Sequence, residues 1–377
     1  MLRLLMRSLV LSTSVVVIAS FAVTALQHSM DTGSVDPTEN AIFDGASRVA
    51  CGQHLYDESN VSATPAPMPG YPFAFLFASG GHDLHFRQLR ALATGIALSL
   101  AVVVGAMVQL ETGSFTLALA SGGFVLLGLD FAPGLPTAAR PEVLMLLLVV
   151  LGFSILRFTQ GIWGVLLAAP LFASAYFVDQ HTGWFLAAAF LALGIEDRPR
   201  LFVFVLVSGL LLGGGFVFLS LRLGPWFNFN TWDAPLATIY AHPGNALRYV
   251  TNHLLGKFSV WVLAALLAFA MPTQPWSGKR GMWMFFVAAA VAACLFSTQT
   301  NHLDPWFLVP GMIALALLGP IMVQRVARHL SAGDDPDLPG SEGVIVTALA
   351  LQFLVLLAAM PISRWLPDLA TLGRVRL

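Results

Sequence analysis

Residues 36–72 begin DPTENAIFDGASRVACGQHLY and end, after a proline-rich run, in GYP. This is the first long polar interval in a chain otherwise made of apolar blocks, and it follows a single apolar segment near the N-terminus. Its acidic residues are Asp36, Glu39, Asp44, Asp57 and Glu58. We expect this interval to carry the charged groups of whatever chemistry the protein performs.

The composition is that of a membrane protein. Hydrophobic residues fill 57% of the 377 positions and charged residues only 10%, with a mean hydropathy of +0.78. A soluble protein of this length needs more charge on its surface. The net charge of −1 argues against nucleic acid as a partner. The polar–apolar alternation of barrel strands is absent from the sequence, so helical spans are predicted.

Repeated apolar blocks predict an all-α, polytopic fold with about eleven transmembrane helices, and residues 1–377 as a single transmembrane domain. The first block, Ser8 to Leu26, follows Arg3 and Arg7, which places the N-terminus in the cytoplasm. A signal peptide cleaved after Ala25 is the alternative. The remaining blocks are 91–110, 115–131, 142–157, 162–178, 183–195, 201–221, 254–271, 282–298, 306–324 and 344–361. Block 183–195 is too short to cross a bilayer unaided and is expected to be tilted or re-entrant.

This topology makes residues 28–88 a long extracytoplasmic loop and residues 331–343 a flexible acidic cytoplasmic linker. The long loop holds seven acidic residues against Arg48 and Arg87, which agrees with an outer location. Arg87 and Arg90 precede the second predicted span, where arginines more often snorkel to the interface than bind lipid phosphates.

The loop is predicted to begin with an amphipathic helix on the outer leaflet. Asp36 suits the cap, Pro37 the first helical position, Glu39 the partner position of a capping box, and Gly52 the end. Two interpretations stay open for the acidic pair. The carboxylates are simple caps, or one is a general base, because a helix N-terminus favours an ionised carboxylate.

Three short motifs carry a resemblance to the GT-C glycosyltransferase superfamily, which includes protein O-mannosyltransferases and aminoarabinose transferases. The first is the loop itself: DPTE, then GQHLY, then a proline-rich run closing in YP. The second is Ala139-Arg140-Pro141-Glu142, which opens a predicted span. The third is Asn301-His302, just before a late span. The usual adjacent Asp-Glu pair is split here into Asp36 and Glu39, and Glu142 stands where Asp is common.

The resemblance implies an inverting transferase in a bacterial inner membrane, with its active site on the extracytoplasmic face. The donor is a sugar on a polyprenyl phosphate, approached from the membrane lipids, and the acceptor is an envelope glycan, lipid or protein. Asp36 or Glu39 is the implied catalytic base. The implied substrate-binding residues are Arg140, Glu142, Tyr56, Tyr71, Arg248, His253, Lys257 and His302, with Arg140 the first candidate for the lipid phosphate.

Each of these residues also has a structural explanation. Arg140 and Glu142 suit a pair at a helix start, and the basic turn 248–257 suits the membrane interface. His302 suits a surface position, and the weakest candidates, Gln180 and His181, lie in another outer loop. Aromatic residues at 226–232 are expected to stack on sugar or to form an interfacial belt. No cofactor is assigned. The two cysteines form no motif with metal-ligand spacing, and a divalent cation is left open.

Two other functions compete with the transferase: a transporter or flippase, and a polysaccharide polymerase of envelope biogenesis. A transporter is expected to carry charged residues or broken helices near the middle of its spans. Here the charged residues cluster at the ends of the apolar blocks, which favours a site at the membrane surface. A catalytically inactive scaffold on the same fold is also compatible with the split acidic motif.

Overall fold

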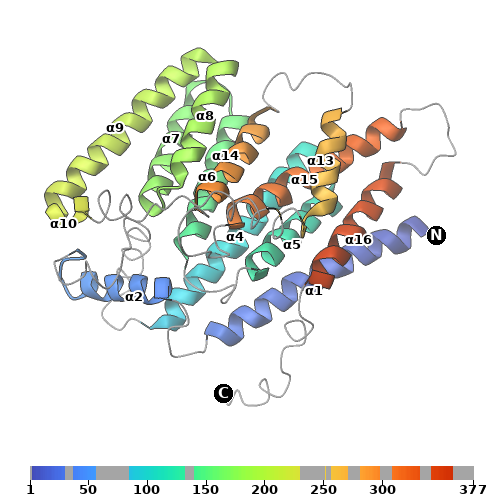
Figure 1. The fold of residues 1–377 in the computed structure, drawn as a ribbon, viewed down its shortest axis with the longest axis horizontal. Helices are drawn as coiled ribbons and strands as arrows, with labels where there is room; N and C mark the ends of the chain where they lie inside the picture. Colours follow the sequence, from blue (N-terminus) through green and yellow to red (C-terminus); the bar gives the residue numbers. More distant parts are fainter. Residues whose placement is uncertain are drawn as a thin grey trace.

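The computed structural model describes residues 2–29, 37–56, 85–131, 140–229, 251, 256–270, 281–297, 308–331 and 341–359. Every regular element in these ranges is a helix (Figure 1). The apolar helices are α1 (Leu2–Ser29), α4 (Phe86–Thr112), α5 (Phe115–Phe131), α6 (Pro141–Phe158), α7 (Gly161–Val178), α8 (Thr182–Glu196), α9 (Arg198–Leu223), α13 (Ser259–Ala270), α14 (Met282–Ser297), α15 (Val309–Ser331) and α16 (Ser341–Ala359). Two more are short or amphipathic: α2 (Pro37–Ala50) and α10 (Pro225–Asn228).

These elements confirm the predicted all-α fold and its eleven apolar helices. Five of them, α4, α6, α7, α9 and α15, are long and apolar enough to cross a membrane by themselves. Several predicted boundaries are shifted by five residues or more. α1 begins at Leu2 and not at Ser8, and α13 begins at Ser259 and not at 254. α4 begins at Phe86, so Arg90, which was expected at the interface, lies inside the helix, buried and paired with Glu39 of α2. α15 continues to Ser331 and ends in a polar turn with Arg328 and His329.

The short helix α8 is continuous and lies beside α7, α9 and α14 (Figure 1). Its 15 residues span about 22 Å, less than the ~30 Å of a bilayer core. Block 183–195 is therefore a single short helix within the bundle, and none of it turns back on itself.

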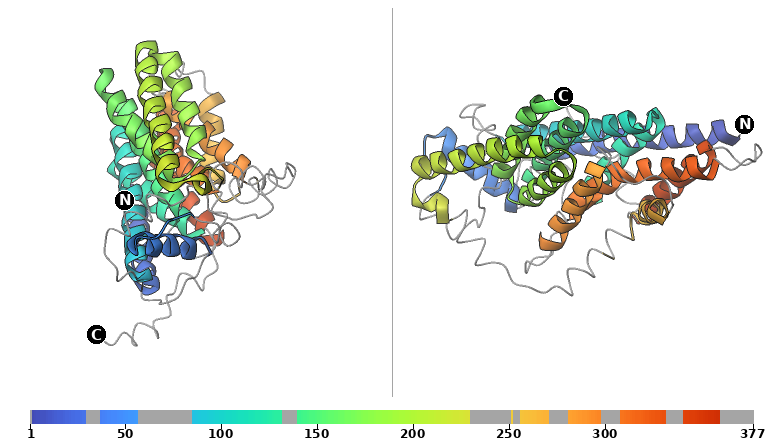
Figure 2. Two further views of the ribbon diagram at one scale, coloured as in Figure 1. Left: turned by 90° about the vertical axis from the view of Figure 1, so that its left-hand side faces the viewer. Right: turned by 90° about the horizontal axis from the view of Figure 1, so that it is seen from above.

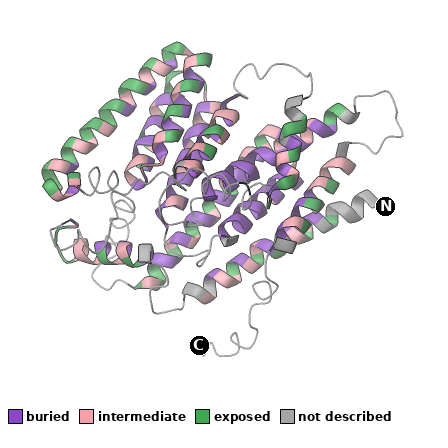
Figure 3. Ribbon diagram, in the orientation of Figure 1, coloured by how far each residue is buried: buried purple, intermediate pink, exposed green. Residues whose placement is uncertain are grey.

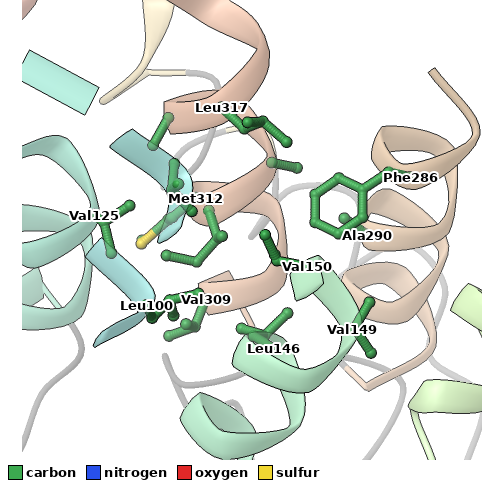
Figure 4. Packing of buried hydrophobic residues seen from close by; sticks show 14 of the residues in the cluster. Leu100, Val125, Leu146, Val149, Val150, Phe286, Ala290, Val309, Met312 and Leu317 are labelled. Carbon is green, nitrogen blue, oxygen red and sulfur yellow. The ribbon is translucent and has the colours of Figure 1, made fainter. Parts of the chain in front are cut away.

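α15 is the central helix of the bundle. Of its apolar window, 83% is buried, and it packs against α4, α5, α13, α14 and α16. Figure 4 shows Val309 of α15 beside Leu100 of α4, and Met312 of α15 near Val125 of α5. α9 is the opposite case, because only 11% of its window is buried and it lies at the edge of the bundle (Figure 3). Its exposed Phe202, Leu210 and Leu221 suit contact with lipid.

α2 does not run with the spans. It lies crosswise at one end of the bundle, between the start of α4 and the region of α10 (Figures 1 and 2). Ile42 and Ala46 face the core and are buried, whereas Asn40 and Asp44 are exposed. Gly52, with a φ of +72°, follows the helix in a conformation that favours glycine. The predicted amphipathic helix is thus confirmed, and we call this end of the bundle the α2 end.

A close approach of α15 to α13 gives a stability prediction. A Cβ at Gly319 would lie 2.5 Å from Cγ of the buried Trp261, whereas a Cβ at Gly209 in α9 would meet nothing within 4 Å. Gly319→Ala is expected to lower the unfolding free energy by about 1–3 kcal/mol through overpacking. Gly209→Ala is the control, expected to be neutral or slightly stabilising. Thermal unfolding in one detergent compares them, and equal midpoints would contradict the packing.

Candidate functional site

A buried ion pair joins α2 to α4. Arg90 donates to Glu39 through Nη2 at 2.7 Å and through Nε at 2.9 Å, and both side chains are 0% exposed. Phe43 stacks on Phe86 next to this pair, with ring centroids 4.1 Å apart, and the Arg90 guanidinium lies 5.5 Å from the Phe86 ring. The first turn of α2 is therefore fixed to the first turns of α4 by a charge pair and an aromatic contact together.

This pair changes the interpretation of both residues. Arg90 is buried and paired, so the expectation that it snorkels is wrong. Both carboxylate oxygens of Glu39 accept hydrogen bonds from Arg90, which gives Glu39 a third role beside cap and base. Its catalytic role stays a prediction. Asp36, the other candidate base, lies outside the described residues, but the chain places it immediately before Pro37, the first residue of α2.

A second Arg–Glu pair stands at the start of α6. Arg140 is the N-cap residue, Pro141 takes the first helical position, and Glu142 lies in the first turn. The shortest distance between the two charged groups, Arg140 Nη1 to Glu142 Oε1, is 3.7 Å. A charge-assisted hydrogen bond is about 2.7–2.9 Å long, so this pair is loose. The two side chains are mostly buried, at 9% and 16% exposure.

The two pairs lie at the same end of the bundle. At the opposite end, Arg157 of α6 donates to Glu111 of α4 at 2.8 Å, which aligns the two helices. Arg90 precedes Glu111 by 21 residues, and Arg140 precedes Arg157 by 17. At 1.5 Å per residue, the levels of Arg90 and Arg140 along the bundle therefore differ by only about 6 Å. The structure thus brings Glu39, Arg140 and Glu142 to the α2 end.

A carboxylate–histidine pair lies between α7 and α8 at that end. Asp179 Oδ1 accepts from the backbone N–H of His181 at 2.9 Å and lies 2.7 Å from its ring Nδ1. Burial alone would raise the pKa of Asp179, but the charge and hydrogen bonds of His181 lower it below its ordinary value. Burial alone would lower the pKa of His181, but Asp179 and the nearby charge of Glu142 raise it.

Among the candidates from the sequence, His181 ranked among the weakest, and Asp179 was not one of them. The pattern that was available is the D-x-H spacing, because an Asp side chain often accepts from the backbone N–H two residues later. No sequence pattern indicated that the charge of Glu142 acts on His181, because the two residues lie on different segments. We call Arg140, Glu142, Asp179 and His181 the α6–α8 polar cluster.

Tyr56 lies in an apolar cluster. It is 8% exposed and packs with Leu219 of α9 and Phe227 of α10, its ring centroid 6.0 Å from that of Phe227. Partly buried Tyr176 and Phe177 at the end of α7 complete the contact. The segment after α2 is therefore held to α7, α9 and α10, while the start of α2 is held to α4. The substrate-binding role of Tyr56 stays a prediction.

Lys257 precedes α13, and its backbone carbonyl accepts from Gln352 Nε2 of α16 at 2.7 Å. The other predicted site residues, Tyr71, Arg248, His253 and His302, lie outside the described residues, as Asp36 does. Within the ranges that the structure describes, no three His, Cys, Asp or Glu side chains are grouped to hold a metal ion.

The opposite end of the bundle is tied by closed polar contacts. Glu111 accepts from Arg157 and also from Trp283 Nε1 of α14 at 2.9 Å. Arg200 of α9 donates to the carbonyl oxygens of Leu156 and Thr159 at the end of α6. The carbonyl groups at the end of α6 thus have hydrogen-bond donors, and Glu111 and Arg157 are paired with each other. Glu111, Arg157 and Arg200 therefore have a structural role.

Comparison with solved structures identifies the fold. ArnT from Cupriavidus metallidurans, in a crystal structure bound to undecaprenyl phosphate, matches 91% of this chain and 76% of its own chain, with a TM-score of 0.57 and 16% sequence identity. The chain has the fold of ArnT. No protein-family model matches the chain, and no curated protein matches it by sequence. ArnT is a GT-C glycosyltransferase, so the expected GT-C fold is confirmed.

The Glu39–Arg90 pair gives a stability prediction. Glu39→Ala leaves the Arg90 guanidinium buried without its carboxylate, which is expected to cost about 3–5 kcal/mol of unfolding free energy. Joint replacement by Met at both positions is expected to restore most of that stability. Asp44→Ala on the exposed face of α2 removes only an i,i+4 pair with Arg48 and is the control. Unfolding in lipid nanodiscs measures all three, and a cost at Glu39 no larger than at Asp44 would refute the anchor.

The Asp179–His181 pair gives a pH prediction. Its stabilisation is fully present below the ordinary His value of 6.5 and is lost as pH rises through the raised pKa of His181. It is also present above the ordinary Asp value of 3.8 and is lost as pH falls through the lowered pKa of Asp179. The melting temperature of the wild type minus that of His181→Gln should therefore be largest between these values. A difference that does not change with pH would exclude the ion pair.

Proposed function

We propose that the chain is a membrane glycosyltransferase that moves a sugar from a polyprenyl-phosphate donor to an envelope acceptor. The observation that carries the proposal is the fold shared with ArnT over 91% of the chain, because the ArnT structure holds undecaprenyl phosphate. A shared fold by itself does not fix a reaction. The second support is the α6–α8 polar cluster and the anchored α2, which gather charged groups at one end of the bundle.

The proposed orientation puts the α2 end outside the cytoplasm. Arg3 and Arg7 begin α1, which then runs toward the α2 end. By the positive-inside rule this sets the N-terminus in the cytoplasm of a bacterial inner membrane, with residues 28–88 outside and 331–343 inside. The chain works as one transmembrane domain, with the donor reaching the α2 end from the lipid.

In the proposed reaction, Asp36 is the base. It takes the proton of the acceptor hydroxyl, the oxygen attacks the anomeric carbon from the side opposite the phosphate, and the bond from that carbon to the phosphate oxygen breaks. The electron pair leaves with the polyprenyl phosphate, whose added negative charge needs a cation in a low-dielectric setting. Arg140 supplies that cation. Glu39 acts through Arg90, by holding α2 and so the position of Asp36.

The other predicted residues complete the proposed site. Glu142 orients Arg140 or holds the acceptor, and Tyr56 and Tyr71 flank the sugar. Arg248, His253 and Lys257 supply further cationic or hydrogen-bonding groups to the phosphate, and His302 supplies a hydrogen bond to phosphate or sugar. A divalent cation stays open as a cofactor, because carboxylates alone do not specify one.

The positions of the charged residues favour this function over transport. In the described apolar helices, the acidic and basic residues lie near helix ends, among them Arg90, Glu111, Arg157 and Arg200. The buried polar residues nearer the middle, such as Ser121, Ser208 and Gln352, are neutral. A conduit for ions or charged substrates is expected to hold charged groups at mid-membrane depth. The described spans therefore suit a site at the surface.

A reconstituted assay tests the proposal. The full chain in proteoliposomes is supplied with undecaprenyl-phosphate-linked sugars and an envelope extract as acceptor, and donor consumption is measured. Asp36→Asn is expected to lower the rate by about 10²–10⁴-fold, the usual contribution of a general base. Asp44→Asn, eight residues later and exposed on α2, is the control and should keep the wild-type rate. Absence of donor turnover by the wild type would overturn the function, and equal rates for both variants would overturn the base.

A further inference from the structure

Arg200 differs from the other buried arginines in the described part of the chain. Two of these arginines, Arg90 and Arg140, each face a glutamate within ion-pair distance. Arg200, near the start of α9, is only 5% exposed, and no carboxylate of the described residues lies within that distance of its guanidinium. A buried charge without a counter-ion is costly. An anion is therefore expected beside Arg200.

The hydrogen bonds of the Arg200 guanidinium come from one of its nitrogens. Nη2 donates to the carbonyl oxygens of Leu156 at 3.0 Å and of Thr159 at 3.2 Å, which covers the C-terminus of α6. Nε and Nη1 meet no acceptor among the described residues. Asp197 caps α9 by accepting from the backbone N–H of Arg200, not from its guanidinium. The helix-capping role of Arg200 thus explains Nη2 and leaves two nitrogens for another acceptor.

The first turn of α7 lies against the same guanidinium. A Cβ at Gly164 would lie 3.3 Å from Nη2 of Arg200, and Thr159, which accepts from Nη2, comes two residues before the helix begins at Gly161. The N-cap residue Gln160 has the extended backbone of a cap, but its side chain makes no cap hydrogen bond. The positive end of the α7 dipole and a buried guanidinium therefore lie together, and both favour an anion.

The exposed side chains around this position are apolar. Trp163 in the first turn of α7 is 73% exposed, and Phe202, two residues after Arg200, is 70% exposed. α9 packs beside α7 at the edge of the bundle, and only 11% of its apolar window is buried (Figure 3). Tryptophan is enriched where a membrane meets water, and basic residues near the ends of spans bind lipid headgroups. An anion with apolar chains suits these surroundings better than a free ion does.

We propose that the turn between α6 and α7, together with the start of α9, binds the phosphate of an anionic phospholipid, whose acyl chains lie along the exposed face of α9. Arg200 supplies its charge and Nη1, and the first N–H groups of α7 supply hydrogen bonds. Arg198, exposed at the start of α9, adds a second positive charge. The site lies at the end away from α2, so it is independent of the proposed function.

The experiment measures thermal unfolding of the full chain in phosphatidylcholine nanodiscs that contain an increasing fraction of phosphatidylglycerol. A lipid that binds the folded state raises its unfolding midpoint. Arg200→Gln is expected to raise the phosphatidylglycerol fraction that gives half of this effect on the order of tenfold, because a hydrogen bond to a charged group is lost. Arg222→Gln, exposed in the last turn of α9, removes the same charge from the same helix and is the control.

A second variant separates the anion site from folding. Gln160→Asp places a carboxylate at the N-cap of α7, where it caps the first N–H groups and suits the helix dipole. In phosphatidylcholine alone this variant should unfold at the wild-type midpoint or above it. Its rise with phosphatidylglycerol should shrink, because the new carboxylate competes with the lipid phosphate. If Arg200 only caps α6, Gln160→Asp should show the full wild-type rise.

Three results would overturn the proposal. The first is a wild type whose midpoint does not respond to phosphatidylglycerol. The second is an equal response in the wild type, Arg200→Gln and Gln160→Asp. The third is a wild type in phosphatidylcholine that inorganic phosphate stabilises as much as phosphatidylglycerol does, because the site would then bind a free ion and not a lipid. The proposed function stands in each case, since donor consumption is its own test.

Discussion

A carboxylate and a guanidinium with no exposed surface hold the amphipathic helix to the membrane bundle. Placing two charges in such a setting is costly unless they pair closely, and Glu39 and Arg90 do so through two contacts under 3 Å. Because the penalty for separating them is large, the start of α2 cannot leave α4 without exposing both charges. The other end of the same segment is held by the apolar cluster around Tyr56 and Phe227. The polar stretch that follows α1 is thereby fixed at two points across one end of the bundle.

The same electrostatic constraint orders the rest of the chain. Charges are confined to the ends of the apolar helices, and each end uses them differently. At the end away from α2, Glu111 accepts from both Arg157 and Trp283, and Arg200 covers the last carbonyls of α6. Those contacts are short and closed, as expected of contacts that support structure. At the α2 end, Arg140 and Glu142 are separated by 3.7 Å beside a second ion pair.

The sequence predicted the features that depend on neighbours along the chain. Apolar length located eleven helices, most within a few residues of their observed ends, and capping residues located α2 from Pro37 to the turn at Gly52. What it could not predict were the partners of charged residues. Glu39 and Arg90 are 51 positions apart, and either one alone suits a cap or an interfacial anchor. Asp179 and His181 are two positions apart, and their spacing predicts a turn. The electrostatic effect of Glu142 on His181, in contrast, depends on how α6, α7 and α8 pack.

This difference matters for how the acidic motif is understood. In the sequence, Glu39 suits two roles, a helix cap and a catalytic base, and both require an ionised carboxylate at the start of the helix. The structure adds a third role, an anchor, which also requires an arginine on another helix. A shift of that partner by one residue would turn it by about 100° around α4 and expose a buried charge. The separation of Asp36 from Glu39 then has a physical reason. One carboxylate fixes the helix, and under the proposed function the residue just ahead of that helix in the sequence serves as the base.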